Sequence, residues 1–222
     1  MKYPINEMYE TIQGEGFYAG QPSIFIRIQG CPIRCSWCDT KHTWKLLNEN
    51  QVEPKNIINK KKSTKNWAFL NTFEIIYFIK KYNWKAKHIV ITGGEPCVFN
   101  LKILTKELEK KGYSCQIETS GTHTIYCSKK TWVTVSPKIT IGKKIVNSAI
   151  FRANEIKYAI LNNSDVIKLK IFLKSMKKNI RSKLIFLQPI NQDKKATDLC
   201  IKLCLINNWR LSIQIQKYLV IP

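Results

Sequence analysis

Apolar positions recur along the chain with two periods, which predict strands and helices in alternation. Runs of β-branched residues predict strands, and apolar positions three or four apart predict helices. The expected strands are 24–28, 88–91, 115–118, 132–135, 155–160, 184–187 and 210–215. The expected helices are 72–82, with Asn71 or Thr72 as its cap, 101–111, closed by Gly112, 165–177 and 197–207.

Strands that alternate with helices indicate a parallel sheet of βα units, and such sheets carry function at the carboxyl ends of their strands. We therefore expect an α/β fold with one domain over residues 1–222. Chemically interesting residues follow the expected strands at 30–31, 92–96, 118–121, 136–138 and 188–189. We expect these segments to meet at one edge of the sheet. The polar stretch from about 48 to 66 predicts an inserted loop.

Polar residues also alternate within several expected strands. The pairs are Arg27 with Gln29, Gln116 with Glu118, and Glu155 with Lys157. Charged residues are seldom buried without a partner. We therefore favour a polar interior that holds a ligand, although helix termini and solvent would also accommodate these side chains.

Composition narrows the class of protein. The chain has 222 residues, 44% hydrophobic and 23% charged, as in a globular protein. No apolar run approaches the roughly 18 residues of a membrane span, and the first residues lack the apolar core of a signal peptide. We expect a cytoplasmic protein with no membrane contact. In that reducing compartment its eight cysteines favour metal binding over disulfides, at least where they cluster.

The net charge of +22 raises the question of nucleic acid. Only five of the 37 basic residues are arginine, and the lysines are scattered along the chain. An abundance of Lys and Ile with little Ala is the pattern of an AT-rich genome. We therefore interpret the charge as a solvated lysine surface and expect no direct contact with nucleic acid.

Three cysteines cluster with the spacing C-x3-C-x2-C, at Cys31, Cys35 and Cys38. Three thiolates can hold three irons of a [4Fe–4S] cluster, which leaves the fourth iron open for S-adenosylmethionine (SAM). Zinc held by these cysteines and His42 is the alternative, but structural zinc sites normally pair C-x2-C knuckles. A zinc site would also leave the segment Thr92-Gly93-Gly94-Glu95-Pro96 unexplained.

The cysteine spacing, Trp37 and the GGEP segment resemble the radical SAM superfamily. Further motifs resemble the 7-carboxy-7-deazaguanine synthase family from Met1 to Pro222, most weakly at about 48–70 and 139–152. These motifs are Pro4-Ile5-Asn6-Glu7, Thr11–Gly16, Phe25–Cys31, Cys38–Lys41, Ile117–Thr122, Val135–Lys138 and Leu187–Pro189. The resemblance implies a partial (βα) barrel of the radical SAM type.

The resemblance also implies a reaction. Members convert 6-carboxy-5,6,7,8-tetrahydropterin to 7-carboxy-7-deazaguanine, a step of queuosine biosynthesis. A deoxyadenosyl radical abstracts hydrogen at C6, and rearrangement, ring contraction and loss of ammonia follow. The implied cofactors are a [4Fe–4S] cluster, SAM and Mg²⁺. The implied partners are the pterin, an electron donor such as flavodoxin or ferredoxin, and a second copy in a homodimer.

Site residues follow by the same resemblance. Thr40 resembles the magnesium ligand, which suits a hard cation. The SAM contacts are expected at Trp37, Cys38, Asp39, Gly94, Ser136, Pro137, Lys138, Gln188 and Pro189. The substrate contacts are expected at Ile12, Gln13, Gly14, Arg27, Thr92, Glu118 and Pro222. From the residues alone, an internal salt bridge from Arg27 to Glu118 or Glu95 is the alternative.

One position departs from the family pattern. Members often have a histidine in a Gln-Thr-His-Lys stretch near the C-terminus, where this chain has Gln216. Glutamine can form hydrogen bonds but cannot carry a charge or shuttle a proton. Two other functions compete with the family assignment, an activase of glycyl-radical enzymes and a zinc-stabilised RNA-binding module.

Overall fold

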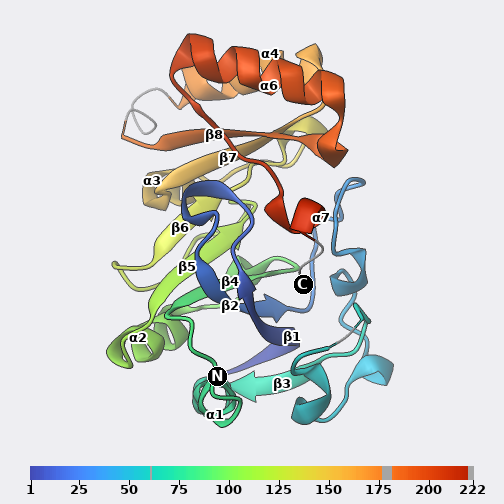
Figure 1. Ribbon diagram of the computed structural model, residues 1–222, viewed down its shortest axis with the longest axis vertical. Coiled ribbons are helices and arrows are strands. Elements are labelled where there is room, and N and C mark those ends of the chain that lie inside the picture. The colour runs from blue at the N-terminus through green and yellow to red at the C-terminus, as the bar shows by residue number, and fades with distance from the viewer. Residues whose placement is uncertain (61, 177–181, 220–222) are drawn as a thin grey trace. The chain divides into compact units, whose positions relative to one another are not determined.

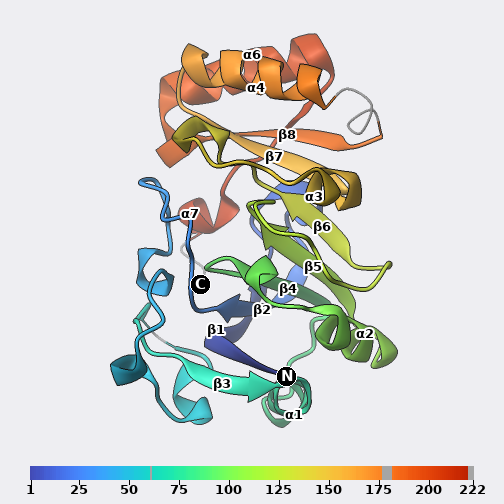
Figure 2. The same ribbon diagram turned by 180° about the vertical axis from the view of Figure 1, so that it is seen from behind.

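The computed structural model describes residues 1–60, 62–176 and 182–219, and Figures 1 and 2 show its elements from two sides. The chain divides into two compact units. Unit 1 comprises Met1–Ile12, Gln21–Glu118 and Tyr126–Trp132. Unit 2 comprises Gln13–Gly20, Thr119–Ile125 and Val133–Pro222.

The sheet of unit 1 has strands in the order β3-β1-β2-β4-β5. Their bounds are β1 Lys2–Ile12, β2 Pro22–Ile28, β3 Ala68–Asn71, β4 His88–Gly93 and β5 Ser114–Thr119. β2, β4 and β5 are parallel, whereas β1 is antiparallel to β2 and β3. The segments that follow β2 and β4 therefore leave the same edge of the sheet, as expected for 30–31 and 92–96.

β2 shows how the sequence pattern divides the faces of this sheet. Ile24, Ile26 and Ile28 are fully buried and lie on one face, because side chains of a strand alternate. Phe25 and Arg27 lie on the opposite face. The alternation places a charged side chain in the interior of unit 1.

The helices of unit 1 begin and end as the sequence indicates. α1 spans Thr72–Lys81, and Asn71 caps it by accepting hydrogen bonds from the backbone N–H groups of Phe73 and Glu74. The Glu74 carboxylate in turn accepts from the Asn71 N–H, which completes a capping box. α2 spans Lys102–Lys110, and Gly112 follows with a φ of +86°.

Unit 2 contains parallel strands in the order β6-β7-β8-β9. Their bounds are β6 Trp132–Val135, of which Trp132 belongs to unit 1, β7 Glu155–Ile160, β8 Leu184–Pro189 and β9 Arg210–Leu211. The helices are α3 Asn147–Arg152, α4 Asn163–Ser175, α6 Lys194–Asn207 and α7 Ile215–Leu219. α4 and α6 lie side by side over β7 and β8 (Figures 1 and 2).

Short 3₁₀ helices occupy several connections. They are η1 Gly16–Tyr18, η2 Lys41–Thr43, η3 Asn48–Asn50, η4 Pro54–Ile57, η5 Pro96–Val98, η6 Ile139–Ile141 and η7 Ile190–Gln192. The stretch predicted as an inserted loop thus contains η3 and η4. Ile57 and Ile58 bury their side chains from this stretch, so its apolar residues contribute to the core of unit 1.

Several expectations differ from the structure. β1, β3 and α3 were not among the expected elements, although seven of the eleven residues of β1 are buried. The helix expected over 197–207 begins at Lys194. The last strand ends at Leu211 instead of residue 215, and α7 follows it. The helix expected over 165–177 begins at Asn163, and residue 177 lies outside the described residues.

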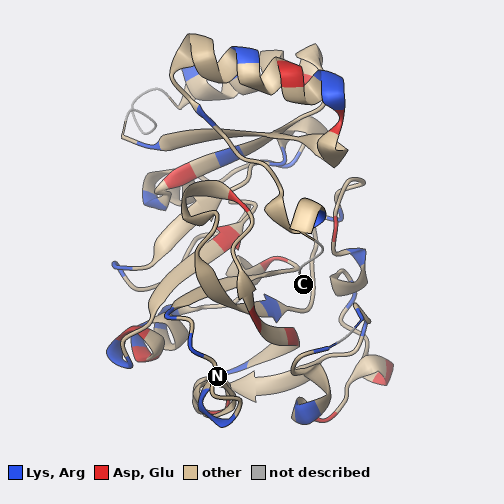
Figure 3. Cartoon of the chain, in the orientation of Figure 1, with Lys and Arg blue, Asp and Glu red and all other residues tan. Residues whose placement is uncertain are grey.

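Lys and Arg are distributed over helices, strands and loops of both units (Figure 3). This distribution agrees with the interpretation of the +22 charge as a lysine-rich surface. Within the described parts of the chain, no helix has the length and apolar character needed to cross a membrane.

Candidate active site

The loop that carries the three cysteines is closed at its base by backbone hydrogen bonds. Residues 31–40 form neither helix nor strand. At the start of the loop, the Gly30 N–H donates to the carbonyl of Thr43 at 2.7 Å, and the Cys31 N–H donates to that of Trp44 at 3.0 Å. These bonds fix both ends of the loop without any contribution from the thiols.

The glycine pair after β4 lies against the same base. The Gly94 N–H donates to the carbonyl of Ile28 at 2.7 Å, and the Glu95 N–H donates to that of Gly30 at 2.9 Å. Gly93 has a φ of +118°, and a Cβ at either glycine would overlap the backbone of the 28–30 segment. The glycine pair therefore lets two backbone segments approach each other closely.

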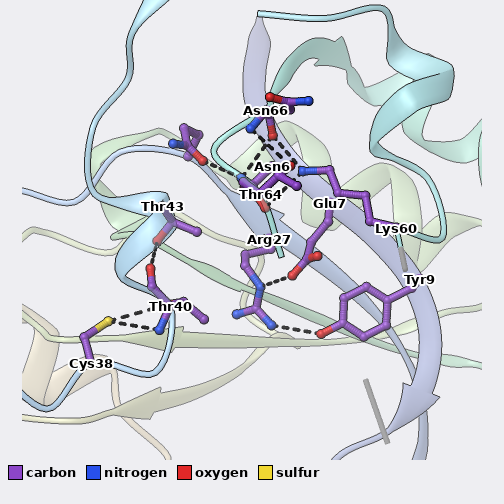
Figure 4. A network of polar contacts seen from close by, with 11 residues as sticks. Asn6, Glu7, Tyr9, Arg27, Cys38, Thr40, Thr43, Lys60, Thr64 and Asn66 are labelled. Atoms are coloured by element: carbon purple, nitrogen blue, oxygen red, sulfur yellow. Dashed lines mark hydrogen bonds and ion pairs between the residues drawn. The ribbon is translucent and has the colours of Figure 1, made fainter. Parts of the chain in front are cut away.

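The thiols lie along the loop. Cys35 is buried and Cys31 and Cys38 are half-buried, and all three are free of disulfides. The Cys38 N–H donates to the Cys35 carbonyl at 3.1 Å, which forms a turn between two of the thiols. The backbone N–H of Thr40 donates to Cys38 Sγ at 3.4 Å, and Thr40 Oγ1 lies 3.6 Å from the same sulfur (Figure 4). Burial raises the pKa of the Cys31 thiol.

This donor set fits a cluster held by three thiolates. In the described residues no three His, Cys, Asp or Glu side chains are gathered closely enough to hold a metal ion. The fit therefore rests on chemistry: three thiols outside any disulfide lie on one loop without regular structure, and an N–H group already donates to one sulfur. Hydrogen bonds from N–H groups stabilise a thiolate and tune a cluster.

The other expected SAM residues of unit 1 lie on the loop or beside its base. Trp37 is half-buried, and Asp39 is exposed near the end of the loop. Gly94 lies next to Gly30 and Cys31, so it adjoins the first cysteine. The structure thus brings Gly94 beside the cysteine loop.

Arg27 forms a buried ion pair with a residue that the sequence analysis did not select. Its Nε donates to Glu7 Oε1 at 2.6 Å, and its Nη2 donates to the Tyr9 hydroxyl at 2.8 Å (Figure 4). Burial alone would lower the pKa of Arg27, but Tyr9 and Glu7 outweigh it and raise the pKa. The alternative of an internal salt bridge to Glu118 or Glu95 is therefore corrected in its partner, because the bridge forms with Glu7.

Those two acids have other contacts. Glu95 Oε1 accepts from the Cys97 N–H at 3.0 Å and so caps η5. Glu118 Oε1 accepts from the Gln116 amide at 2.9 Å near the end of β5. The position that carries the partner of Arg27 is on β1, where Glu7 lies directly opposite Arg27 in the antiparallel register. Glu7 could have been found by recognising the N-terminal segment as a strand that pairs with β2.

A second polar network surrounds Asn6 and includes Lys60 from the stretch predicted as a loop (Figure 4). The Asn6 amide donates to Gln29 Oε1 at 2.7 Å, and the Gln29 amide donates to the Lys45 carbonyl at 2.7 Å. Lys60 Nζ donates to the Asn66 carbonyl at 2.7 Å. Burial lowers the pKa of Lys60 to about 8. Lys60 was not expected to be half-buried, because the lysines were interpreted as a solvated surface.

The remaining substrate residues expected in unit 1 are placed on its strands. Ile12 ends β1 and is exposed. Thr92 lies on β4 directly opposite Arg27 on β2. The structure thus brings Thr92 and Arg27 together, whereas Ile12 lies at the far end of the β1–β2 register, opposite Pro22.

In unit 2, Gln13 and Gly14 begin a buried turn that Glu15 holds. Lys157 Nζ donates to Glu15 Oε2 at 2.6 Å, and the side-chain amides of Gln214 and Gln216 both donate to Glu15 Oε1 at 2.9 Å. Burial acts to raise the pKa of Glu15, but Lys157 and the two amides outweigh it and lower the pKa to about 2. The Gly14 carbonyl accepts from the Ile215 N–H at 3.1 Å.

The expected SAM residues of unit 2 follow β6 and end β8. The Ser136 N–H donates to the Thr119 carbonyl at 2.7 Å, and Lys138 Nζ donates to Ser136 Oγ at 2.7 Å. Gln188 Oε1 accepts from the Ser212 hydroxyl at 3.1 Å. Pro137 and Pro189 are buried. Pro222 lies outside the described residues.

Comparison with known proteins assigns the family. The model of the radical SAM superfamily matches residues 25–133. A 7-carboxy-7-deazaguanine synthase of Buchnera aphidicola subsp. Schizaphis graminum is 59% identical and covers 100% of both chains. That of Escherichia coli K12 is 48% identical over 99% of each chain. This chain belongs to the 7-carboxy-7-deazaguanine synthase family.

A solved structure confirms the fold class of this family member. The crystal structure of QueE from Escherichia coli matches with a TM-score of 0.92 and 48% identity, covering 96% of this chain and 94% of that chain. The prediction of an α/β partial barrel of the radical SAM type is therefore confirmed. Membership in the radical SAM superfamily implies a [4Fe–4S] cluster and SAM.

Membership in the 7-carboxy-7-deazaguanine synthase family also decides between the competing assignments. Because the chain belongs to this family, it is neither a glycyl-radical activase nor a zinc-stabilised RNA module. His42, the fourth ligand of the zinc alternative, instead contributes its backbone carbonyl, which accepts from the Gln29 amide at 3.1 Å. Burial lowers the pKa of its ring.

Proposed function

We propose that the chain converts 6-carboxy-5,6,7,8-tetrahydropterin to 7-carboxy-7-deazaguanine with loss of ammonia, as a step of queuosine biosynthesis. The observation that carries this proposal is the 59% identity with a 7-carboxy-7-deazaguanine synthase over the whole of both chains. The closed cysteine loop beside Gly94 and the buried Arg27 agree with it.

Cys31, Cys35 and Cys38 would hold the [4Fe–4S] cluster in this proposal. SAM would lie against Trp37, Asp39 and Gly94, together with Ser136, Pro137, Lys138, Gln188 and Pro189. When bound, these groups supply radical chemistry that removes a hydrogen atom from the pterin. The protein closes the base of the loop by backbone hydrogen bonds and so keeps the three thiols on a short, defined segment.

Substrate binding would use the Arg27 guanidinium, several neutral groups and the carboxylates of Glu118 and Pro222. Arg27 would accept the pterin carboxylate, because a guanidinium pairs with two carboxylate oxygens at once. Thr92, directly opposite it, would contribute a hydroxyl from the neighbouring strand. The further contacts would come from Ile12, Gln13, Gly14, Glu118 and Pro222. Thr40 would supply a hydroxyl oxygen to Mg²⁺.

The chain would act in the cytoplasm as a homodimer. Each copy would form one domain of residues 1–222. An electron donor such as flavodoxin or ferredoxin would reduce the cluster. No direct contact with nucleic acid or membrane is required, because the substrate is a free pterin.

Anaerobic reconstitution with iron and sulfide, followed by turnover, tests the proposal. The protein is incubated with SAM, reductant, magnesium and the carboxytetrahydropterin, and products are identified by mass spectrometry. We expect 7-carboxy-7-deazaguanine from the wild type and none from Cys35→Ala, which should lose the cluster. Cys127→Ala is the matched control and should retain both the cluster and the formation of 7-carboxy-7-deazaguanine. Reductive cleavage of SAM without conversion of the pterin would refute the proposed substrate.

A further inference from the structure

The Arg27 site contains a geometric detail that its expected role does not explain. β1 and β2 are antiparallel neighbours, and the register sets Glu7 directly opposite Arg27. Side-chain exposure is 13% for Arg27 and 9% for Glu7, so both charges lie inside unit 1. Tyr9 is held two residues further along β1, where its ring stacks on Phe25 at a centroid distance of 5.6 Å. The sheet therefore determines where both partners of Arg27 lie.

The two partners occupy one side of the guanidinium. Glu7 accepts from Nε, and the Tyr9 hydroxyl accepts from Nη2. A guanidinium has five N–H donors in a rigid plane. The remaining three N–H donors, on Nη1 and Nη2, find no acceptor among the residues that the structure describes. They are arranged to meet a planar anion with two oxygens.

The Arg27 side chain is 13% exposed, and its unpartnered nitrogens are not fully enclosed, so an anion can reach these donors. Glu7 also fixes the rotation of the guanidinium plane, because a charge-assisted bond of 2.6 Å to Nε leaves the side chain little freedom. Without Glu7 the guanidinium would rotate, and its outer edge would no longer be held in one direction.

We propose that Glu7 is a positioning residue for substrate binding, which holds Arg27 so that its outer N–H edge receives the carboxylate of the pterin. Tyr9 braces the same plane from Nη2 with a neutral hydroxyl and contributes less, because a neutral hydrogen bond is weaker than a charged one. Glu7 makes no contact with the ligand in this arrangement. The inference rests on the proposed function and deepens it by assigning the residue that positions Arg27.

The test compares Glu7→Ala with Glu7→Gln, since glutamine retains an oxygen that can accept from Nε. We expect Glu7→Ala to raise KM for the carboxytetrahydropterin about tenfold with a smaller change in kcat, and Glu7→Gln to recover most of the loss. Tyr9→Phe should change KM by less than about threefold. Glu107→Gln, which breaks an exposed ion pair with Lys110, is the control for lost acidic charge.

Two further measurements separate positioning from general support of the fold. In an Arg27→Met background, Glu7→Ala should add no further increase in KM, because it acts through Arg27. The dissociation constant of pterin-6-carboxylate should rise in Glu7→Ala, whereas that of pterin without the carboxylate should not.

The outcomes distinguish this inference from the proposed function. Equal weakening of both pterins, or additive losses in the double variant, would refute the positioning role even if the wild type makes product. A wild type that makes no product would refute the proposed function, and the two dissociation constants would still decide the role of Glu7.

Discussion

Two buried ion pairs, one in each unit, have the same length and opposite surroundings. Arg27–Glu7 in unit 1 and Lys157–Glu15 in unit 2 both measure 2.6 Å. In unit 2 the acid is fully engaged, because Lys157 and the amides of Gln214 and Gln216 all donate to it. In unit 1 the cation keeps N–H donors without acceptors among the described residues.

The difference indicates two uses of buried charge. A pair whose bonds are all made within the protein holds segments together, here the turn at Glu15, β7 and the segment that carries Gln214 and Gln216. A pair in which N–H donors remain without an acceptor in the described residues is arranged for a ligand. Breaking a buried pair is expensive in either case, but only the second should change substrate binding selectively.

Replacing Glu15 should give the largest effect on stability. Glu15→Ala leaves Lys157 buried without its partner, and we expect the free energy of unfolding to fall by about 3 kcal/mol. Urea denaturation measures this change. Glu53→Ala, which removes an exposed pair with Lys55, should leave stability unchanged within the error of the measurement. A Glu15→Ala variant with the stability of the wild type would show that the Lys157–Glu15 pair does not hold these segments together.

The pH dependence of stability sharpens the same point. The pKa of Glu15 falls from its ordinary 4.5 to about 2 in the folded protein. Its stabilising contribution is therefore complete above pH 4.5 and is lost as the pH falls toward 2. The stability difference between wild type and Glu15→Gln should shrink over that range. A difference that stays constant from pH 5 to pH 2 would contradict the lowered pKa.

Arg27→Lys should separate binding from stability. Lysine retains the charge and can still pair with Glu7, but it lacks the planar fork that matches a carboxylate. We expect kcat/KM to fall about thirtyfold, which corresponds to about 2 kcal/mol, with a smaller change in the free energy of unfolding. If the variant loses stability and keeps its KM, the contrast between the two pairs fails.

The smallest effect is expected at Lys60. Its folded-state pKa of about 8 lies below its ordinary 10.5, so the unfolded chain binds more protons between these values. The stability of the wild type should therefore rise relative to Lys60→Met from pH 8 to 10.5. We expect a change on the order of 1 kcal/mol, because the side chain is half-exposed and water screens its charge. A flat or falling difference would show that Lys60 is solvated.

Local patterns predicted most of the fold. β6 and β7 have the bounds expected from their β-branched residues, and the Asn71 cap follows from its side chain. β1 was missed because its buried residues include Asn6 and Glu7, which interrupt an apolar pattern. The last strand was predicted too long because Ser212 and Gln214 alternate with apolar residues, although both are buried polar residues that bond to the turn at 15–16.

The candidate site was predicted less completely than the fold. Motif spacing selected Cys31, Cys35, Cys38 and the glycine pair as candidates, because each motif is contiguous in sequence. Glu7 was missed as the partner of Arg27, since only the register of β1 and β2 brings the two together. Pairings of this kind depend on tertiary structure, which local periodicity does not encode.

The closure of the cysteine loop has a consequence for a chain that works with an oxygen-sensitive centre. Gly30 and Cys31 on one side and 43–44 on the other are joined by main-chain bonds, and Gly94 and Glu95 secure the same base. None of these bonds uses a thiol or a metal atom, so loss of the metal centre removes none of their donors or acceptors. We expect the two ends of the ten-residue loop to stay joined when the metal centre is lost.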